Sequence, residues 1–155
     1  AGVLEHVLPG AVQQPLAPLV HLEQSLNVAP EALRRLALLG GDDPAQRFRL
    51  TRKQARQFAL LREGLQSGAG TAELAYRHGP VCARDIELLR AASFGAPLPA
   101  LLDADLDLGA AAQFPIRAAD LMPRYAGPDL GRELAKRERR WIRSGFALGR
   151  ADLLE

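Results

Sequence analysis

The sequence has few of the residues that build β-sheets. Val, Ile and Thr together number eleven of the 155 residues, against 28 Leu and 27 Ala. Strands favour β-branched and aromatic side chains, whereas helices favour Ala and Leu. The composition therefore predicts an all-α protein, a compact array of about eight short helices without a significant sheet.

Cysteine and long apolar runs are also scarce. Cys82 is the one cysteine, which excludes a disulfide within the chain and fits a reducing compartment. No apolar run reaches the roughly 20 residues that cross a bilayer. The first residues lack the basic and then apolar pattern of a signal peptide. We expect a cytoplasmic protein with no membrane partner.

Residue patterns typical of catalysis are equally sparse. Asp103, Asp105 and Asp107 have the Asp-x-Asp spacing of a two-metal site, but their surroundings lack strand character. On a helix, carboxylates at i and i+2 diverge by about 200°. The three histidines lie far apart in the sequence, and Cys82 has no nearby histidine to activate it. We therefore expect no catalytic residue, metal, cofactor or small-molecule substrate in this chain.

The spacing of the leucines and the positions of glycine and proline divide the chain into helical segments. Thr51 and Gln54 form a capping box, which marks one helix start. We treat residues 1–155 as one helical region and keep two packed lobes, about 1–95 and 96–155, as an alternative. The helices expected cover 15–27, 30–39, 51–66, 71–78, 80–93, about 101–108 and 127–144, with short helical ends near residues 1–8 and 151–154.

The helix expected over 127–144 carries the clearest charge pattern. Gly127 and Pro128 suit its start, and Gly145 suits a left-handed cap after its end. One face is apolar. The opposite face carries a cationic ridge, which we define as Arg132, Lys136, Arg139 and Arg143. Arg137 projects toward the apolar side, where it either extends its head to the edge of the core or stacks on Trp141.

A second basic segment precedes the middle of the chain. Arg52, Lys53 and Arg56, here named the 52–56 patch, face away from the apolar side of the 51–66 helix. The net charge is only +2, but such local concentrations of positive charge attract polyanions. Both basic surfaces are therefore candidate phosphate contacts.

Four phrases follow one another from Phe114 to Leu154: F-P-I-x-x-x-D-L-M, G-P-x-L-G-x-x-L, W-I-x-x-x-F and L-x-x-x-x-L-L. They resemble the carboxy-terminal body and tail of bacterial CCA-adding tRNA nucleotidyltransferases of the poly(A) polymerase family, alphaproteobacterial type. GVLEHVLPGA and LAYRHGP are also similar to that branch. Where the family usually has glycine, this chain has Ala118. The motif residues to which the resemblance gives structural roles are Asp120, Leu121, Gly127, Pro128, Gly131 and Trp141.

The resemblance implies that this chain holds tRNA while an amino-terminal head adds the 3′ CCA end. That head, with its catalytic carboxylates and Mg²⁺, is not in this sequence, so the chain alone should bind without turnover, whereas the parent would use CTP and ATP. The expected RNA contacts are the cationic ridge and the 52–56 patch. Two alternatives stay open: a helical protein-interaction scaffold, and a helix-turn-helix DNA-binding protein formed by LAYRHGPVCARDIELL.

Overall fold

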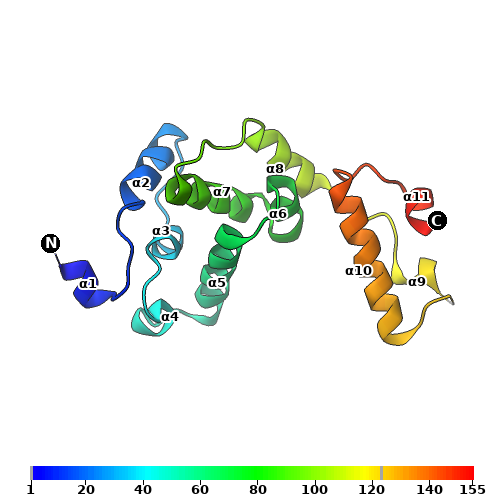
Figure 1. Cartoon of the computed structure of the whole chain (residues 1–155), viewed down its shortest axis with the longest axis horizontal. Helices are drawn as coiled ribbons and strands as arrows, with labels where there is room; N and C mark the ends of the chain where they lie inside the picture. The colour runs from blue at the N-terminus through cyan, green and yellow to red at the C-terminus, as the bar shows by residue number, and fades with distance from the viewer. Residues whose placement is uncertain (1, 123) are drawn as a thin grey trace. The chain divides into compact units, whose positions relative to one another are not determined.

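The computed structural model describes residues 2–122 and 124–155, which contain eleven helices and no sheet (Figure 1). The all-α prediction is confirmed. The helices are α1 (Val3–Val7), α2 (Leu16–Ser25), α3 (Ala32–Leu39), α4 (Pro44–Arg47), α5 (Arg52–Gln66), α6 (Thr71–His78), α7 (Pro80–Phe94), α8 (Leu102–Ala111), α9 (Ala118–Leu121), α10 (Gly127–Arg143) and α11 (Arg150–Leu154).

Two of these helices were not expected. α4 lies in a segment whose Gly, Asp and Pro content indicates a loop, and Pro44 occupies its first turn. α9 lies within the phrase that begins at Phe114. Each has four residues, too few for an apolar repeat that a sequence pattern could show.

The chain forms two compact units, divided between Ala110 and Ala111. α8 belongs almost wholly to the first unit because it packs closely on α6. Gly109 makes this contact possible, since a Cβ at this position would lie 2.7 Å from the Cβ of Ala75. Leu106 and Leu74 enter the same buried cluster.

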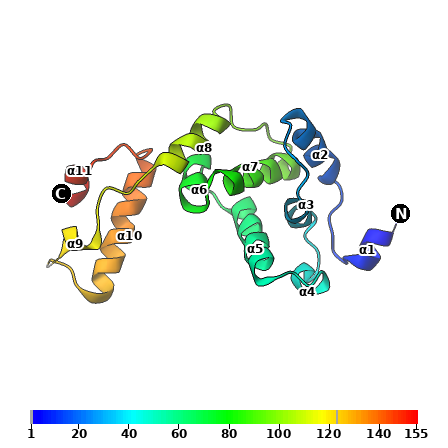
Figure 2. The ribbon, with the colours of Figure 1, turned by 180° about the vertical axis from the view of Figure 1, so that it is seen from behind.

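In the first unit, α7 is the central helix. It packs against α2, α3, α5 and α6, and both ribbon views show it between α2 and α6 (Figures 1 and 2). Ile86, Leu88 and Leu89 are fully buried. Burying a leucine or isoleucine contributes roughly 1.5–3 kcal/mol, so this helix supplies much of the core energy of the unit.

A buried ionic cluster joins three helices of that unit. The guanidinium of Arg34 on α3 donates to Glu23 on α2 at 2.7 Å and to Asp85 on α7 at 2.6 Å. It also donates to the carbonyl of Ala29. Arg35 holds the second oxygen of Glu23 at 2.6 Å. Because each buried charge has an opposite partner, the cluster avoids the large cost of isolated buried ions.

Arg90 on α7 holds the connection between α5 and α6. Its guanidinium donates to the carbonyls of Gly64, Ser67 and Ala69 at 2.8–2.9 Å and also pairs with Glu87. The carbonyl of Gly64 belongs to the last turn of α5 and also accepts from the amide and the hydroxyl of Ser67. One side chain therefore fixes the 67–70 corner.

The second unit is built around Trp141 of α10. Its side chain is buried, with Phe114 at 5.4 Å and Phe146 at 4.8 Å between ring centroids. α9 packs against α10. Gly145 has φ 67°, and its amide donates to the carbonyl of Ile142, so the predicted left-handed cap is confirmed.

In the part of the chain that the structure describes, no helix is long and apolar enough to cross a membrane.

Candidate nucleic-acid interface

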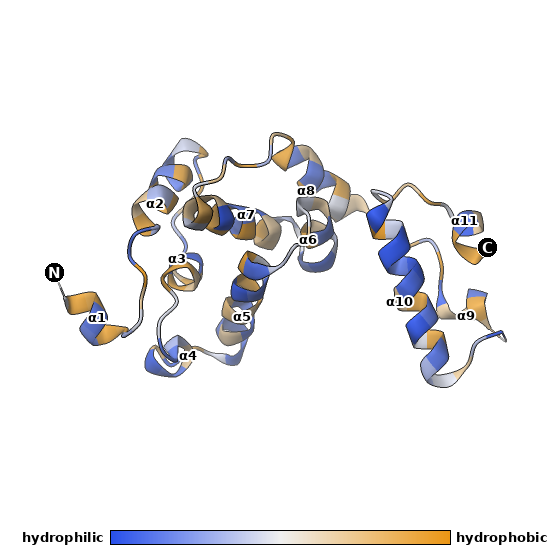
Figure 3. Ribbon diagram, viewed as in Figure 1, coloured by the Kyte–Doolittle hydropathy of each residue, from blue (hydrophilic) through white to orange (hydrophobic). Residues whose placement is uncertain are grey.

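The cationic ridge lies along α10, which begins as its sequence predicts. Gly127 has φ 54°, a left-handed conformation that glycine adopts without strain, and Pro128 follows in the first turn. α10 is largely hydrophilic, as Figure 3 shows. All four ridge residues, Arg132, Lys136, Arg139 and Arg143, are exposed on this one helix.

The ridge is not uniformly charged. Arg132 pairs with Asp129, and Lys136 lies 3.7 Å from Glu133. Further along the helix, Arg139, Arg140 and Arg143 have no acidic partner within residues 2–122 and 124–155. The uncompensated positive charge of α10 is therefore concentrated in its last two turns.

A groove of about 600 Å³ opens beside these turns. α10, α11 and the segment just before α10 each contribute side chains to it. Lys136, Arg139 and Arg143 belong to the ridge predicted from the sequence, whereas Arg124 and Arg140 were not predicted. The lining residues are Arg124, Tyr125, Glu133, Lys136, Arg137, Arg139, Arg140, Arg143, Leu153 and Glu155.

The position of Arg140 could have been predicted from the sequence, because on a helical wheel it lies between Lys136 and Arg137. The position of Arg124 could not, since its place beside the groove depends on how the segment before α10 folds.

Arg137 does not stack on Trp141 in the way the sequence allowed. Its guanidinium lies 5.7 Å from the centre of the Tyr125 ring, donates to the carbonyl of Leu153 at 2.7 Å and pairs with Glu133. Only 12% of the side chain is exposed. The Arg137 hydrogen bond, together with Lys136, lowers the pKa of Glu133 and so favours its charged form. Arg137 thus joins α10 to α11 and has little capacity left for a ligand.

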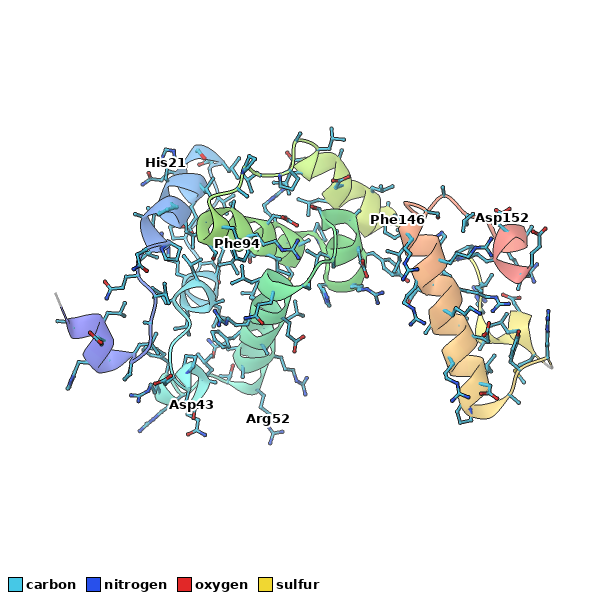
Figure 4. The ribbon with its side chains drawn as sticks, in the orientation of Figure 1. His21, Asp43, Arg52, Phe94, Phe146 and Asp152 are labelled. Carbon is cyan, nitrogen blue, oxygen red and sulfur yellow. The ribbon has the colours of Figure 1, made fainter. Side chains whose placement is uncertain are left out.

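The 52–56 patch lies in the first unit, on the first two turns of α5. Arg52, Lys53 and Arg56 are exposed, and Figure 4 shows the Arg52 side chain extending away from the ribbon. Their helix starts with the predicted capping box, in which Thr51 and Gln54 each accept from the other's backbone amide. Cations in a first turn oppose the helix dipole, which costs about 0.3–1 kcal/mol each. Stability therefore does not explain their position.

The residues to which the resemblance gives structural roles lie in different surroundings. Asp120 accepts from the amide of Arg117 at 2.7 Å and from the guanidinium of Arg150 at 2.8 Å. The hydrogen bonds from Arg150 and from that amide lower its pKa. Leu121 is buried. Gly131, in contrast, is exposed, and a Cβ there would meet nothing within 4 Å.

Other candidate groups have ordinary surroundings. Asp103, Asp105 and Asp107 lie on α8, where Asp103 pairs with Arg84. Burial, with a smaller effect of Asp85, raises the pKa of Cys82 to about 11, so the thiol is protonated at neutral pH. In the described ranges no three His, Cys, Asp or Glu residues are grouped to hold a metal. The histidines His6, His21 and His78 are exposed.

The segment that resembles a helix-turn-helix forms α6, a turn at Gly79 and α7. A DNA-reading helix presents its side chains to the groove. In α7, however, eight of fifteen residues are buried. This burial weighs against α7 as a recognition helix.

Comparisons with models of protein families, with curated proteins and with solved structures found no match for the chain.

Proposed function

We propose that the chain is a helical tRNA-binding module, of the kind that forms the body and tail of a CCA-adding tRNA nucleotidyltransferase. One observation carries the binding part of this proposal: Arg139, Arg140 and Arg143 are exposed on one helix without acidic partners among the described residues. Exposed guanidiniums without an acidic partner are suited to phosphate oxygens. The sequence resemblance adds tRNA as the particular polyanion.

Binding would act on the RNA backbone and its shape. Neutralising phosphates releases counterions, and this sequence-independent effect dominates such affinities. Base stacking has little support, because the Trp141 ring is buried and Tyr125 lies beside the guanidiniums of Arg124 and Arg137. The proposed role is therefore to hold a folded RNA.

The chemistry of CCA addition would belong to the head that the resemblance implies, including Mg²⁺ and the selection of CTP and ATP. No catalytic residue is proposed in this chain. Such a role would place it in the cytoplasm, where tRNA ends are processed.

The test is a titration of the purified chain with tRNA, duplex DNA and heparin at two salt concentrations. Preferential binding of tRNA over both other polyanions supports the proposal. A protein-interaction scaffold predicts that tRNA binds no better than heparin, and a helix-turn-helix protein predicts a preference for duplex DNA.

Two matched double substitutions on α10 test the assignment of contacts. Arg139→Glu/Arg143→Glu should weaken tRNA binding on the order of 100-fold and reduce the salt slope by about two. Arg132→Glu/Lys136→Glu makes the same charge change where acidic neighbours already compensate, so its effect should be smaller. Unchanged affinity and slope in both variants would show that the ridge is not the contact surface.

A further inference from the structure

The groove beside α10 extends beyond the ridge, because its walls come from three separate segments. Arg124 and Tyr125 precede α10, Arg140 and Arg143 lie in the last turns of α10, and Leu153 belongs to α11. A volume of about 600 Å³ is far larger than the space between two neighbouring side chains. A ligand group can therefore enter the groove and contact several cations at once.

The chemistry of the lining indicates an anion. Pockets for small organic ligands are mostly apolar with a few polar groups. Here six of the ten lining residues are Arg or Lys, and two are acidic. One of the two acids, Glu133, already pairs with Arg137 and Lys136. The groove consequently keeps an excess of positive charge for a negatively charged group.

Part of the groove wall is fixed before any ligand binds. Arg137 contacts Tyr125, Glu133 and the carbonyl of Leu153, so it holds α11 against α10. Arg140, three residues further along α10, has no acidic partner among the described residues and lines the same groove. A rigid wall next to free guanidiniums lowers the ordering cost of binding.

We propose that this groove holds one phosphodiester group of the bound RNA strand, with Arg140 and Arg143 as its ligands. This inference rests on the proposed function. Lys136, Arg139 and Arg143 belong to both the ridge and the groove, so a strand that follows the ridge reaches the groove without leaving α10. A phosphate held among these segments would help to fix the register of the RNA on the protein.

The first measurement uses inorganic phosphate on the whole chain. Backbone amide shifts are followed by NMR at constant ionic strength, with chloride as the balancing anion. Saturable shifts should concentrate in α10 and α11. Arg140→Gln should weaken phosphate binding at least tenfold, while Arg132→Gln, the same change outside the groove, stays within about twofold. Unsaturable shifts, or equal affinities of the two variants, would overturn the proposal.

The second measurement separates two sources of phosphate. An RNA octamer should bind at least tenfold more tightly than either AMP or inorganic phosphate, and Arg140→Gln should remove most of that advantage. If AMP binds as tightly as the octamer, the groove takes a free nucleotide and the proposal is wrong.

The same variants distinguish failure of the groove from failure of the function. If wild-type chain prefers tRNA to heparin but Arg140→Gln and Arg132→Gln bind tRNA equally, the phosphate site is wrong and the tRNA-binding function stands. If wild-type chain shows no preference for tRNA, the proposed function fails, and with it the RNA phosphodiester as the occupant of the groove.

Discussion

The amide of Phe146 donates to the carbonyl of Trp141 at 3.0 Å, and the rings of the same two residues meet edge to face at 4.8 Å. Together with the bond from Gly145 to Ile142, this is a Schellman ending with its hydrophobic contact. Phe146 must adopt φ 65°, a left-handed conformation that is costly for an aromatic residue. The ring contact thus stabilises a backbone that Phe alone disfavours.

The first prediction inverts the usual order of alanine and glycine. Phe146→Ala removes the ring but keeps a Cβ at positive φ, so it should destabilise the second unit by about 2 kcal/mol. Phe146→Gly loses the same ring but relieves the backbone strain, and it should be more stable than Phe146→Ala by roughly 1 kcal/mol. Urea unfolding followed by Trp141 fluorescence measures both. Equal stability of the two variants would contradict a strained backbone.

The second prediction compares two helical glycines. Gly109→Ala places a Cβ against Ala72 and Ala75 of α6, and it should cost about 2 kcal/mol despite the better helix propensity of alanine. Gly131→Ala meets open space on α10 and should gain up to about 1 kcal/mol. Unfolding is followed by circular dichroism for the first variant and by Trp141 fluorescence for the second. A neutral Gly109→Ala would mean that α8 does not pack on α6 as described.

The third prediction concerns pH and Glu23. Burial opposes its charge, but hydrogen bonds from Arg35 and Arg34 outweigh this effect and lower its pKa below the ordinary value of 4.5. A carboxyl whose pKa is lower in the folded state than in the unfolded state stabilises the protein at pH values above its unfolded-state pKa. This contribution is lost as the pH falls through the folded-state pKa. Glu23→Gln should therefore cost about 3 kcal/mol at pH 7, where it leaves two arginines less well paired.

The difference between wild type and Glu23→Gln should shrink as pH falls below 4.5, because Glu23 itself becomes neutral there. Urea unfolding at pH 7 and at successively lower pH gives this difference directly. A cost that stays constant down to acid denaturation would show that the charge of Glu23 is not the stabilising feature. The pKa of Asp85 shifts in the opposite direction. Burial raises it, and the hydrogen bond from Arg34 offsets this only in part, so the ionisation of Asp85 opposes folding as the pH rises.

Local patterns in the sequence were sufficient to predict most of the helices. The Thr51 and Gln54 capping box and the Gly145 cap are each formed by residues three positions apart, so a short stretch of sequence contains both partners. The four-residue helices α4 and α9 could not be predicted from such patterns. The exposed face of α10 was also predictable, because helical spacing alone places its cations together.

The buried position of Arg34 was not predictable. In ALRRLALL, Arg34 and Arg35 are neighbours of the same type, and only the structure shows that Arg34 is buried. What stabilises it there is a carboxylate eleven residues earlier and another 51 residues later. The groove escaped prediction for the same reason, since Arg124 and Leu153 come together only when the second unit folds.

The hydrogen bonds of Arg90 also determine when, during synthesis of the chain, the first unit can complete its fold. Arg90 donates to the carbonyls of Ser67 and Ala69 in the α5–α6 connection and to that of Gly64 in the last turn of α5, all at least twenty positions earlier in the chain. During synthesis from the amino terminus, α5 and α6 are complete before Arg90 exists. The corner between them can therefore reach its final form only after α7 has been made, so this unit should not fold stepwise helix by helix.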